Sequence, residues 1–468
     1  MTHQLPTDPG LIRSLLRRYD RPGPRYTSYP TAPHFRSGFG RDELAQHIAG
    51  GNEALHPLSL YVHVPYCASP CFYCGCNRVI TRDTSRGVQY AERLQREITW
   101  LAPLFEKRRE VVQLHFGGGT PNFLDLPTLG DLVHTLAGHF SLSTLATRDF
   151  SIELDPRVVS GAVQDYADGL ARLGFNRASI GVQDFDPEVQ RAVNRIQSTT
   201  QTLGLLDACR ASGFRSVNLD LIYGLPRQTL AGFKRTLHTI VAARPDRVAI
   251  YGYAHLPRMF KAQRQIVTAE LPDAEGRLAL LTLAIGELSA AGYHYIGMDH
   301  FALPDDELVR AQQAQQLQRN FMGYTTHAGC DLLGLGASAI SNIGNSYTQN
   351  HRELRDWERA IDAGQPALWR GLTLSRDDRV RADVIGRLMC HGSVEFSQIE
   401  AVHGIRFGEY FAAALQRLQG FRSDGLVELD ARHLTVTALG RLLVRSVAMC
   451  FDAYLAEPGT QPQMSQAV

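Results

Sequence analysis

The sequence has little of what marks secreted, membrane-spanning or disordered proteins. Its 468 residues contain only eight cysteines, far below the density of a disulfide scaffold. No run of about 18 apolar residues occurs, and the first residues lack the apolar core of a signal peptide. With 44% hydrophobic and 20% charged residues, the composition is that of a globular protein. We therefore expect a protein of the reducing cytoplasm with no membrane partner.

An excess of charge of either sign is also absent. The chain has 48 Lys and Arg residues against 47 Asp and Glu residues, a formal net charge of +1. This charge creates no general field for attracting nucleic acid, so we expect no nucleic-acid partner. Any anionic partner must be recognised by local groups.

A regular alternation of strand and helix patterns runs from about residue 58 to residue 257. The strand patterns lie at 59–66, 111–119, 150–156, 178–184, 217–226 and 247–257, with amphipathic stretches between them. Such units predict a parallel sheet built from right-handed crossovers. Each strand ends in Gly, Pro or a polar residue, as in α/β barrels, whose sites lie at the carboxyl ends of the strands. We predict an α/β protein with a partial (β/α)6 TIM-like barrel.

The flanking segments predict an N-terminal arm and a C-terminal domain. The expected division is 1–55 for the arm, 56–300 for the barrel, 301–364 for a Gly-rich active-site segment and connection, 365–455 for the C-terminal domain, and 456–468 for a disordered tail. A strand is expected near 294–303. The glycines of 320–345 favour a substrate or cofactor loop over scaffold.

The C-terminal domain has the pattern of a winged helix. Helical patterns at 378–391, 396–401 and 407–419 precede a hairpin formed by LVEL and HLTVT. No basic recognition stripe is visible at 396–419, so a structural role is favoured over DNA binding.

Four of the eight cysteines fall between positions 67 and 76, directly after the first predicted strand. Cys67, Cys71 and Cys74 have spacings that let three thiolates face one point, as the ligands of a cubane iron–sulfur cluster do. Three ligands leave one iron open for a substrate or cofactor. The alternative is a structural zinc site, but zinc ligands usually come as two separated knuckles.

Glycines and polar residues end the later strands. The triplet 117–119 follows the second strand, where backbone without a Cβ allows close approach of a ligand. Glu153 stands in an otherwise apolar run and can accept hydrogen bonds from a ribose or an ammonium group; a solvated strand end is the alternative. Gln183, Arg195 and Asp220 follow the same logic in the fourth and fifth units.

The CxxxCxxC motif, with Tyr73 just before the third cysteine, resembles the radical S-adenosylmethionine (SAM) superfamily. Longer blocks resemble the oxygen-independent coproporphyrinogen III oxidase (coproporphyrinogen dehydrogenase) family along the whole chain. They include RYTSYPTAPHF, YVHVPYC, HFGGGTPNFL, SIELDPR, VNLDLIYGLP, RNFMGYTT and GLGASAIS. The resemblance implies a radical SAM barrel with a winged-helix-like C-terminal domain.

The resemblance also implies an activity and its cofactors. A [4Fe–4S] cluster on Cys67, Cys71 and Cys74 would cleave S-adenosylmethionine to a 5′-deoxyadenosyl radical. The radical would drive anaerobic oxidative decarboxylation of two propionates of coproporphyrinogen III to vinyl groups, giving protoporphyrinogen IX in heme biosynthesis. An electron donor would reduce the cluster, and we expect a monomer.

Individual residues take roles only through this resemblance. It implies catalytic roles for Tyr61 and Cys76. Glu153 would serve the catalytic SAM, whereas Gln183, Arg195, Asp220 and Ala254 would line a second SAM. The other cofactor-binding positions are Tyr61, Tyr73, Gly118, Gly119, Thr120 and Ile340.

Two alternatives and one departure accompany this interpretation. Heme-binding or heme-trafficking siblings without oxidase activity usually lack a fourth cysteine and the YTSYP arm; Cys76 and residues 26–30 favour the enzyme. A nucleic-acid-binding zinc protein is disfavoured by charge and cysteine spacing. Arg21, Arg25 or Arg319 could pair with propionates or simply be solvated. Met322 stands where the family pattern RNFQGYTT has Gln, so a contact at this position differs here.

Overall fold

The computed structural model describes residues 9–19, 21–159 and 161–456. They form two compact units. The larger comprises Phe35–Glu287 and Gly329–Thr373, and the smaller combines the described parts of Met1–His34, Leu288–Ala328 and Leu374–Val468. Each unit therefore brings together segments that are distant in the sequence. The tail expected at 456–468 lies, apart from its first residue, outside the described residues.

All six predicted strands form in the larger unit. They are β1 (Leu58–Val64), β4 (Glu110–Gly118), β6 (Asp149–Leu154), β7 (Arg177–Gln183), β8 (Ser216–Tyr223) and β9 (Arg247–Gly252). They pair side by side in this order, and every pair is parallel. The predicted α/β fold with six strand–helix units is confirmed.

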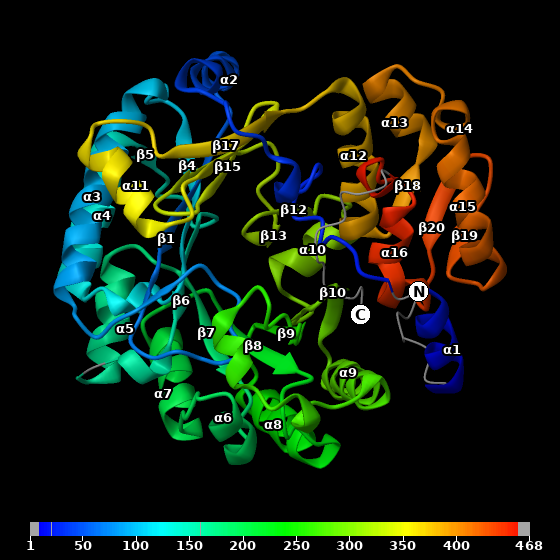
Figure 1. Ribbon diagram of the computed structural model, residues 1–468, viewed down its shortest axis with the longest axis horizontal. Helices are drawn as coiled ribbons and strands as arrows, with labels where there is room; N and C mark the ends of the chain where they lie inside the picture. Colours follow the sequence, from blue (N-terminus) through cyan, green and yellow to red (C-terminus); the bar gives the residue numbers. More distant parts are fainter. Residues whose placement is uncertain (1–8, 20, 160, 457–468) are drawn as a thin grey trace. The chain divides into compact units, whose positions relative to one another are not determined.

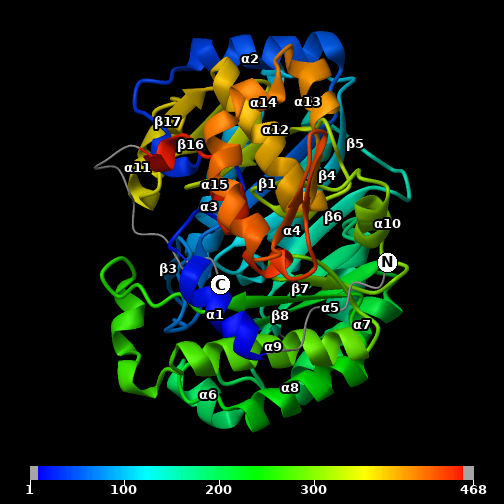
Figure 2. The same cartoon turned by 90° about the vertical axis from the view of Figure 1, so that its right-hand side faces the viewer.

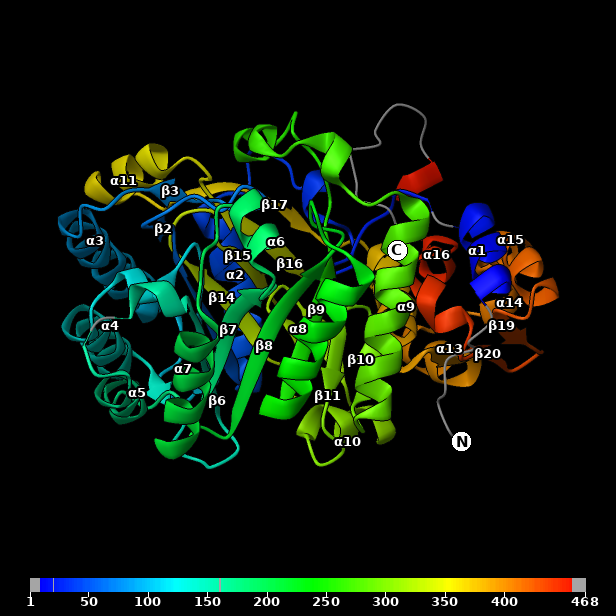
Figure 3. The same cartoon turned by 90° about the horizontal axis from the view of Figure 1, so that it is seen from below.

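Five main helices connect these strands. They are α3 (Ser85–Leu101), α4 (Leu126–His139), α5 (Val163–Arg172), α7 (Thr199–Ala211) and α8 (Leu230–Ala243). Figures 1 and 3 show them along the outer side of the curved sheet. In β1, Leu58, Leu60, Val62 and Val64 are fully buried on one face and Ser59 and His63 are buried on the other, as expected for a strand covered on both faces. Tyr61 and His63 alternate with them and face the other side of the sheet.

The Gly-rich segment is not the loop that its composition suggested. Within it, β14 (Asp331–Leu335) pairs in parallel with β1, on the side of β1 away from β4. Three antiparallel strands continue the sheet: β15 (Ile340–Ile343), β16 (Ser346–Asn350) and β17 (Leu368–Thr373). Every residue of β14 is buried, and a Cβ at Gly334 would lie 2.6 Å from the Ile340 carbonyl oxygen. Glycine here serves strand packing, so the loop prediction is wrong for this half of the segment.

Shorter elements complete the larger unit. They are α2 (Arg41–Ala54), β2 (Tyr66–Cys67), β3 (Val79–Ile80), β5 (Ser141–Leu142), α6 (Pro187–Ala192), α11 (Leu354–Asp362), and the short helices η2 (Ala102–Leu104), η3 (Pro121–Phe123), η4 (Pro156–Val158), η5 (Lys261–Gln265) and η6 (Thr268–Glu270). Helix α9 (Ala274–Ala290) begins in this unit and ends in the smaller one. No helix among the described residues is long and apolar enough to cross a membrane.

The smaller unit contains the C-terminal domain and most of the described N-terminal arm. Its elements are α1 (Pro9–Tyr19), η1 (Ala32–His34), β10 (His294–Gly297), β11 (His300–Ala302), α10 (Glu307–Gln313), β12 (Gln318–Asn320), β13 (Gly323–Thr325), α12 (Arg376–His391), β18 (Ser393–Glu395), α13 (Phe396–His403), α14 (Phe407–Tyr410), α15 (Ala412–Ser423), β19 (Val427–Leu429), β20 (His433–Val436), η7 (Gly440–Leu443), α16 (Val444–Met449) and η8 (Tyr454–Ala456). The strand expected near 294–303 is a hairpin, because the chain turns at Met298, whose φ is +49°.

The winged-helix arrangement is present in this unit. The predicted hairpin forms from β19 and β20, and β18 pairs with the other edge of β20. Helices α12 to α15 accompany this small sheet (Figures 1 and 2). Phe396 and Phe407 stack in its core with ring centroids 4.0 Å apart. The arm packs here too, because Tyr26 is buried and donates a hydrogen bond to Asp452 at 2.9 Å.

Candidate active site

A polar pocket of about 260 Å³ lies at the carboxyl ends of the parallel strands of the larger unit. The site residues that it brings together, all predicted from the sequence, are Cys67, Cys71, Tyr73, Cys74, Cys76, Gly118, Gly119, Thr120, Glu153, Gln183, Arg195 and Asp220. These residues come from five strand–helix units, so the fold gathers at one edge what the sequence separates by 150 residues. Their individual roles stay predictions.

The three cysteines of the motif line this pocket from the loop that follows β1. The short parallel pair β2 and β3 closes the base of the loop. Thr120 donates a hydrogen bond to the Cys67 sulfur at 3.2 Å. The guanidinium of Arg78 donates to the carbonyl oxygens of Cys71 at 3.0 Å and of Cys74 at 3.1 Å. The loop backbone is therefore held in place by contacts that leave the thiols directed into the pocket.

The thiols differ in acidity. A hydrogen bond from the Cys76 thiol, together with nearby Arg78, lowers the pKa of Cys74 to about 6. Burial instead raises the pKa of Cys67 to about 11. The same bond to Cys74 raises the pKa of Cys76 well above its usual value. Cys76 therefore interacts directly with a predicted cluster ligand.

A buried carboxylate with two arginines lies beside Cys71. Asp155 accepts hydrogen bonds from the guanidiniums of Arg157 at 2.6 Å and Arg195 at 3.1 Å. Both arginines also approach the Cys71 sulfur, at 3.4 and 3.6 Å. Burial acts to raise the pKa of Asp155, but Arg195 and Arg157 hold it below its usual value. The two arginines thus place positive charge beside the Cys71 sulfur.

Sequence reasoning did not single out Asp155, Arg157 or Arg78. Asp155 and Arg157 lie in the SIELDPR block, two and four residues after Glu153. That proximity to a predicted site residue was the available signal. The partner of Asp155, Arg195, is 40 residues away in the sequence, which no local pattern reveals.

The glycine triplet packs tightly against protein groups. A Cβ at Gly118 would lie 2.6 Å from the His63 ring, and one at Gly119 would lie 2.8 Å from the Pro65 backbone. Gly118 also has a φ of +119°, which disfavours other residues. A Cβ at Gly117 would lie 2.9 Å from a carboxylate oxygen of Glu153. The protein's own packing thus favours glycine at Gly118 and Gly119 before any ligand is considered, whereas at Gly117 the nearest atom is the end of a side chain that can move.

Glu153 and Tyr61 belong to a set of polar side chains on β1, β4 and β6 that are joined by hydrogen bonds and one ring stack. One oxygen of Glu153 accepts from the Gly118 N–H at 3.1 Å, and the other lies 3.3 Å from His115. The Tyr61 ring stacks on His115, and its hydroxyl bonds His63 at 3.0 Å. The side chain of Glu153 is 42% exposed, so it keeps acceptor capacity for a ligand.

The residues expected around a second cofactor are divided by the structure. Asp220 lines the pocket and accepts from Ser179 at 2.7 Å and Asn218 at 2.8 Å. Burial raises its pKa to about 6. Gln183 lines the pocket from a strand end with a φ of +68°. Ala254 is not part of the pocket lining, and its carbonyl oxygen accepts a hydrogen bond from Gln263 at 3.1 Å.

Two further predicted positions lie outside the lining of this pocket. Tyr61 sits on β1, behind His63 and His115, and Ile340 begins β15. Tyr61 is linked to Glu153 through His115, on which its ring stacks and which lies 3.3 Å from that carboxylate. Ile340 contacts Gly334, which pairs with Tyr61 across β1 and β14.

The arginines considered for the propionates and the departure at Met322 belong to the smaller unit. Arg25 forms an ion pair with Asp299. Arg319 donates to the Arg25 carbonyl oxygen, and its guanidinium lies 5.4 Å from the centre of the Tyr324 ring. Met322 lies at the tip of the β12–β13 hairpin. Arg21 is exposed.

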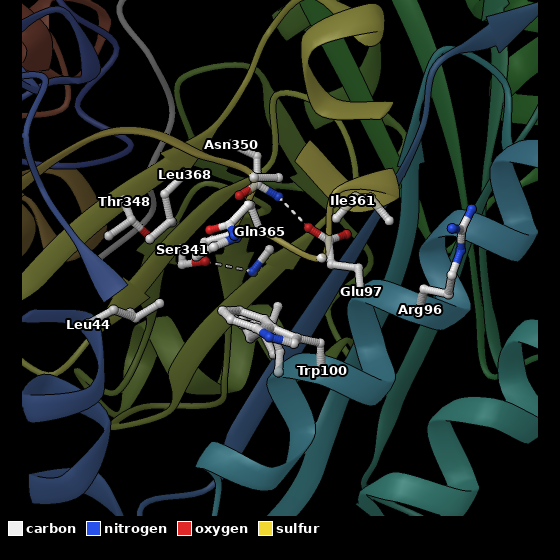
Figure 4. A pocket seen from close by; sticks show the side chains of 16 residues that line it. Leu44, Arg96, Glu97, Trp100, Ser341, Thr348, Asn350, Ile361, Gln365 and Leu368 are labelled. Atoms are coloured by element: carbon white, nitrogen blue, oxygen red, sulfur yellow. Dashed lines mark hydrogen bonds between the residues drawn. The ribbon is translucent and has the colours of Figure 1, made fainter. Parts of the chain in front are cut away.

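A second cavity, of about 180 Å³, lies on the helix side of the sheet (Figure 4). Its walls come from α3, α11 and the strands β14 to β16. They include Trp100 and Ile361, and Glu97 lies at its edge with a hydrogen bond from Asn350 at 2.8 Å. None of the clustered cysteines lines it. Its apolar character indicates a packing defect beside the core, whereas the polar pocket carries the chemistry.

The donor set of the polar pocket fits an iron–sulfur cluster. Three thiols and three cationic side chains converge on one space. One of the cationic side chains is Arg195, whose buried Nε has no hydrogen-bond partner among the described residues.

Comparison with known proteins agrees with these observations. Residues 61–240 match the radical SAM superfamily, and residues 374–443 match the HemN C-terminal domain. The chain is 50% identical over 442 residues to the oxygen-independent coproporphyrinogen III oxidase of Pseudomonas aeruginosa, covering 94% of this chain and 95% of that protein. It is 46% identical over 455 residues to the oxidase of Escherichia coli K12, covering 97% and 98%.

The solved structures give the same answer. The Escherichia coli coproporphyrinogen III oxidase, described as a radical SAM enzyme, superposes with a TM-score of 0.90 at 45% identity and covers 96% of this chain and 100% of that one. The fold of this chain thus matches that of the Escherichia coli enzyme over nearly the full length of both chains. The chain belongs to the oxygen-independent coproporphyrinogen III oxidase family of radical SAM enzymes, which act in heme biosynthesis.

Proposed function

We propose that the polar pocket holds a [4Fe–4S] cluster on Cys67, Cys71 and Cys74, with S-adenosylmethionine beside it, and that it decarboxylates two propionates of coproporphyrinogen III. The convergence of the three thiols with cationic groups on one pocket is the observation that carries this proposal. When bound, the cluster and S-adenosylmethionine supply the one-electron chemistry that starts hydrogen abstraction.

The chain's own residues would bind the cluster and orient S-adenosylmethionine beside it. Thr120 donates to the Cys67 sulfur, and Arg157 and Arg195 place positive charge at the Cys71 sulfur. Iron is ligated by the thiolate form, and the Thr120 hydrogen bond acts against the burial that raises the pKa of Cys67. The carboxylate of Glu153, fixed by the Gly118 N–H, is oriented to accept from an ammonium group of S-adenosylmethionine. Tyr61 and Cys76 are proposed to act on the substrate side of the reaction.

A second S-adenosylmethionine is part of the proposal. Gln183, Arg195 and Asp220 line the same pocket from later strands and support it, whereas Ala254 would have to contribute from beyond the lining. The Nε of Arg195 remains a free donor for a carboxylate. Equilibrium dialysis with labelled S-adenosylmethionine gives the number bound. Two per chain in the native protein and one in Asp220→Ala would support the assignment.

The experiment that tests the function is anaerobic. Reconstituted protein is incubated with coproporphyrinogen III, S-adenosylmethionine and dithionite, and porphyrins are analysed after oxidation. We expect protoporphyrin among the pigments, and iron and acid-labile sulfide in the protein. Absence of vinyl products with an intact cluster would favour a heme-binding sibling, and zinc in place of iron would overturn the cluster.

Location and assembly are also proposals. All eight cysteines are free thiols, the state that a reducing cytoplasm preserves. We expect a cytoplasmic monomer, which light scattering coupled to gel filtration checks.

A further inference from the structure

A second depression adjoins the cysteine loop within the larger unit. Its volume is about 550 Å³. Asn77, Arg78 and Val79, which follow Cys76 directly, form one wall, and the first turns of α11 form the other. We call it the α11 groove.

The α11 groove is rich in arginine. Five arginines line it against three acidic residues, although the whole chain is nearly neutral. Of the acids, Asp356 is already paired with Arg359 at 3.3 Å. Arg352 and Arg355 are exposed and form no ion pair with a described residue. The groove therefore presents uncompensated positive charge to solvent.

The groove is coupled to the cysteine loop through single residues. Arg78 lines both the groove and the cysteine pocket, and its guanidinium binds the carbonyl oxygens of Cys71 and Cys74. Asn77 donates to the Arg352 carbonyl oxygen at 2.8 Å, so the α11 wall is fastened to the residue next to Cys76. A molecule seated in the groove is separated from the cluster ligands by one side chain.

We propose that the α11 groove is the docking surface for the protein that delivers the electron to the cluster, and that this partner is a small acidic carrier with a low-potential one-electron centre. The inference rests on the proposed function, because the cluster must be reduced once for each cleavage. In the step the carrier loses one electron and the cluster gains it, and no bond forms or breaks.

The charge of the groove selects this kind of partner. Complementary charge accelerates encounter and orients the partner without requiring a large buried area. Weak electron-transfer complexes bury small interfaces of this type and dissociate quickly after transfer. An acidic carrier would be drawn to Arg352 and Arg355 and brought against the cysteine loop.

The test compares two double variants with the same change in charge. Arg352→Glu with Arg355→Glu reverses the groove. Arg108→Glu with Arg172→Glu is the control: Arg108 precedes β4 and Arg172 ends α5 before β7, so both are exposed at the opposite, amino-terminal edge of the sheet. The probe is reduced plant-type [2Fe–2S] ferredoxin, an acidic protein with a low reduction potential. Cluster reduction and deoxyadenosine release are followed in low and high salt, with dithionite as the alternative reductant.

We expect the groove variant to be reduced by ferredoxin about 10-fold more slowly than native protein at low salt, with the difference shrinking at high salt. The control variant and Arg352→Lys with Arg355→Lys should behave like native protein. Dithionite should reduce all of them equally, which also shows that they are folded. Equal ferredoxin rates in the groove variant and the control would overturn the docking surface. Failure of native protein to release deoxyadenosine with dithionite would instead overturn the proposed function.

Discussion

Two buried carboxylates in the larger unit are held in opposite ways. Asp155, at the carboxyl ends of the strands, is surrounded by the guanidiniums of Arg157 and Arg195, which keep its pKa below the usual value. Glu97, on α3 outside the sheet, is bonded only by neutral donors: the Gly336 N–H at 2.7 Å, Asn350 at 2.8 Å and Trp357 at 3.3 Å. Burial raises the pKa of Glu97 to about 7.

The difference separates chemistry from scaffold. Around Asp155, positive charge is placed where thiolates are needed, and the surrounding pocket is polar. Around Glu97, hydrogen bonds join α3 to Gly336, which follows β14, and to Asn350 of β16, beside an apolar cavity (Figure 4). Substitutions on the pocket side should therefore change the reaction and spare the fold, whereas substitutions around Glu97 should do the reverse.

The largest effect is expected from removing a cluster ligand. Cys67→Ala, Cys71→Ala or Cys74→Ala should each abolish both deoxyadenosine release and vinyl products, because the remaining thiols cannot hold the cluster. The circular dichroism of the protein should stay native, since the barrel core does not depend on the loop. Iron and sulfide analysis checks the loss; full cluster content in all three variants would refute the ligand assignment.

Cys76→Ser should divide the reaction at a later point. Cys76 contacts Cys74 through a hydrogen bond but lies only two residues beyond it, which is unsuited to an additional ligand of the same cluster. We expect native iron content and native deoxyadenosine release with loss of vinyl products. All three quantities are measured in one preparation. Lost iron would make Cys76 a ligand, and an unchanged product yield would make it structural.

Asp220→Asn, also in the polar pocket, should have a smaller effect on the reaction. It keeps the size of the side chain but removes the charge and one of the two acceptor oxygens that Ser179 and Asn218 use. We expect vinyl-product formation to fall by up to about 100-fold through misplaced ligand, with the cluster signal intact in electron paramagnetic resonance. Asp207→Asn, an exposed change on α7, is the matched control. A missing cluster signal in Asp220→Asn would contradict the assignment.

Features that depend on neighbouring residues in the sequence could be predicted, and features that depend on contacts between distant residues could not. The six strands, their helices and the cysteine loop carry local patterns, so their positions could be predicted to within a few residues. The strand β14 could not, because it pairs with β1, whose residue 58 meets residue 331. Its glycines were therefore interpreted as loop residues, although Gly334 is glycine to let Ile340 approach.

The site shows the same limit. The spacing of Cys67, Cys71 and Cys74 predicts a ligand set by itself, whereas the roles of the other positions are predicted from the resemblance to the family. The link from Asp155 to Arg195 and the contact of Gly118 with His63 exist only after folding. A glycine triplet at a strand end looks the same in sequence whether a ligand or a histidine ring occupies the missing Cβ position.

The smallest effect, on stability alone, is expected from Glu97→Gln. The folded protein binds the Glu97 proton more tightly than the unfolded chain, because its pKa rises from 4.5 to about 7 on burial. The stabilisation from this proton is thus fully present below about pH 4.5 and is lost as pH rises to about 7, at most about 3 kcal/mol. Glutamine does not titrate, so the free energy of unfolding, measured by anaerobic urea titration, should fall less between pH 5 and pH 8 in the variant than in native protein. Vinyl-product formation per folded molecule should stay native in Glu97→Gln, since Glu97 lies outside the lining of the polar pocket. An identical pH slope in both proteins would show that Glu97 titrates normally, and a loss of product at full cluster content would show that the two sides of the sheet are not independent.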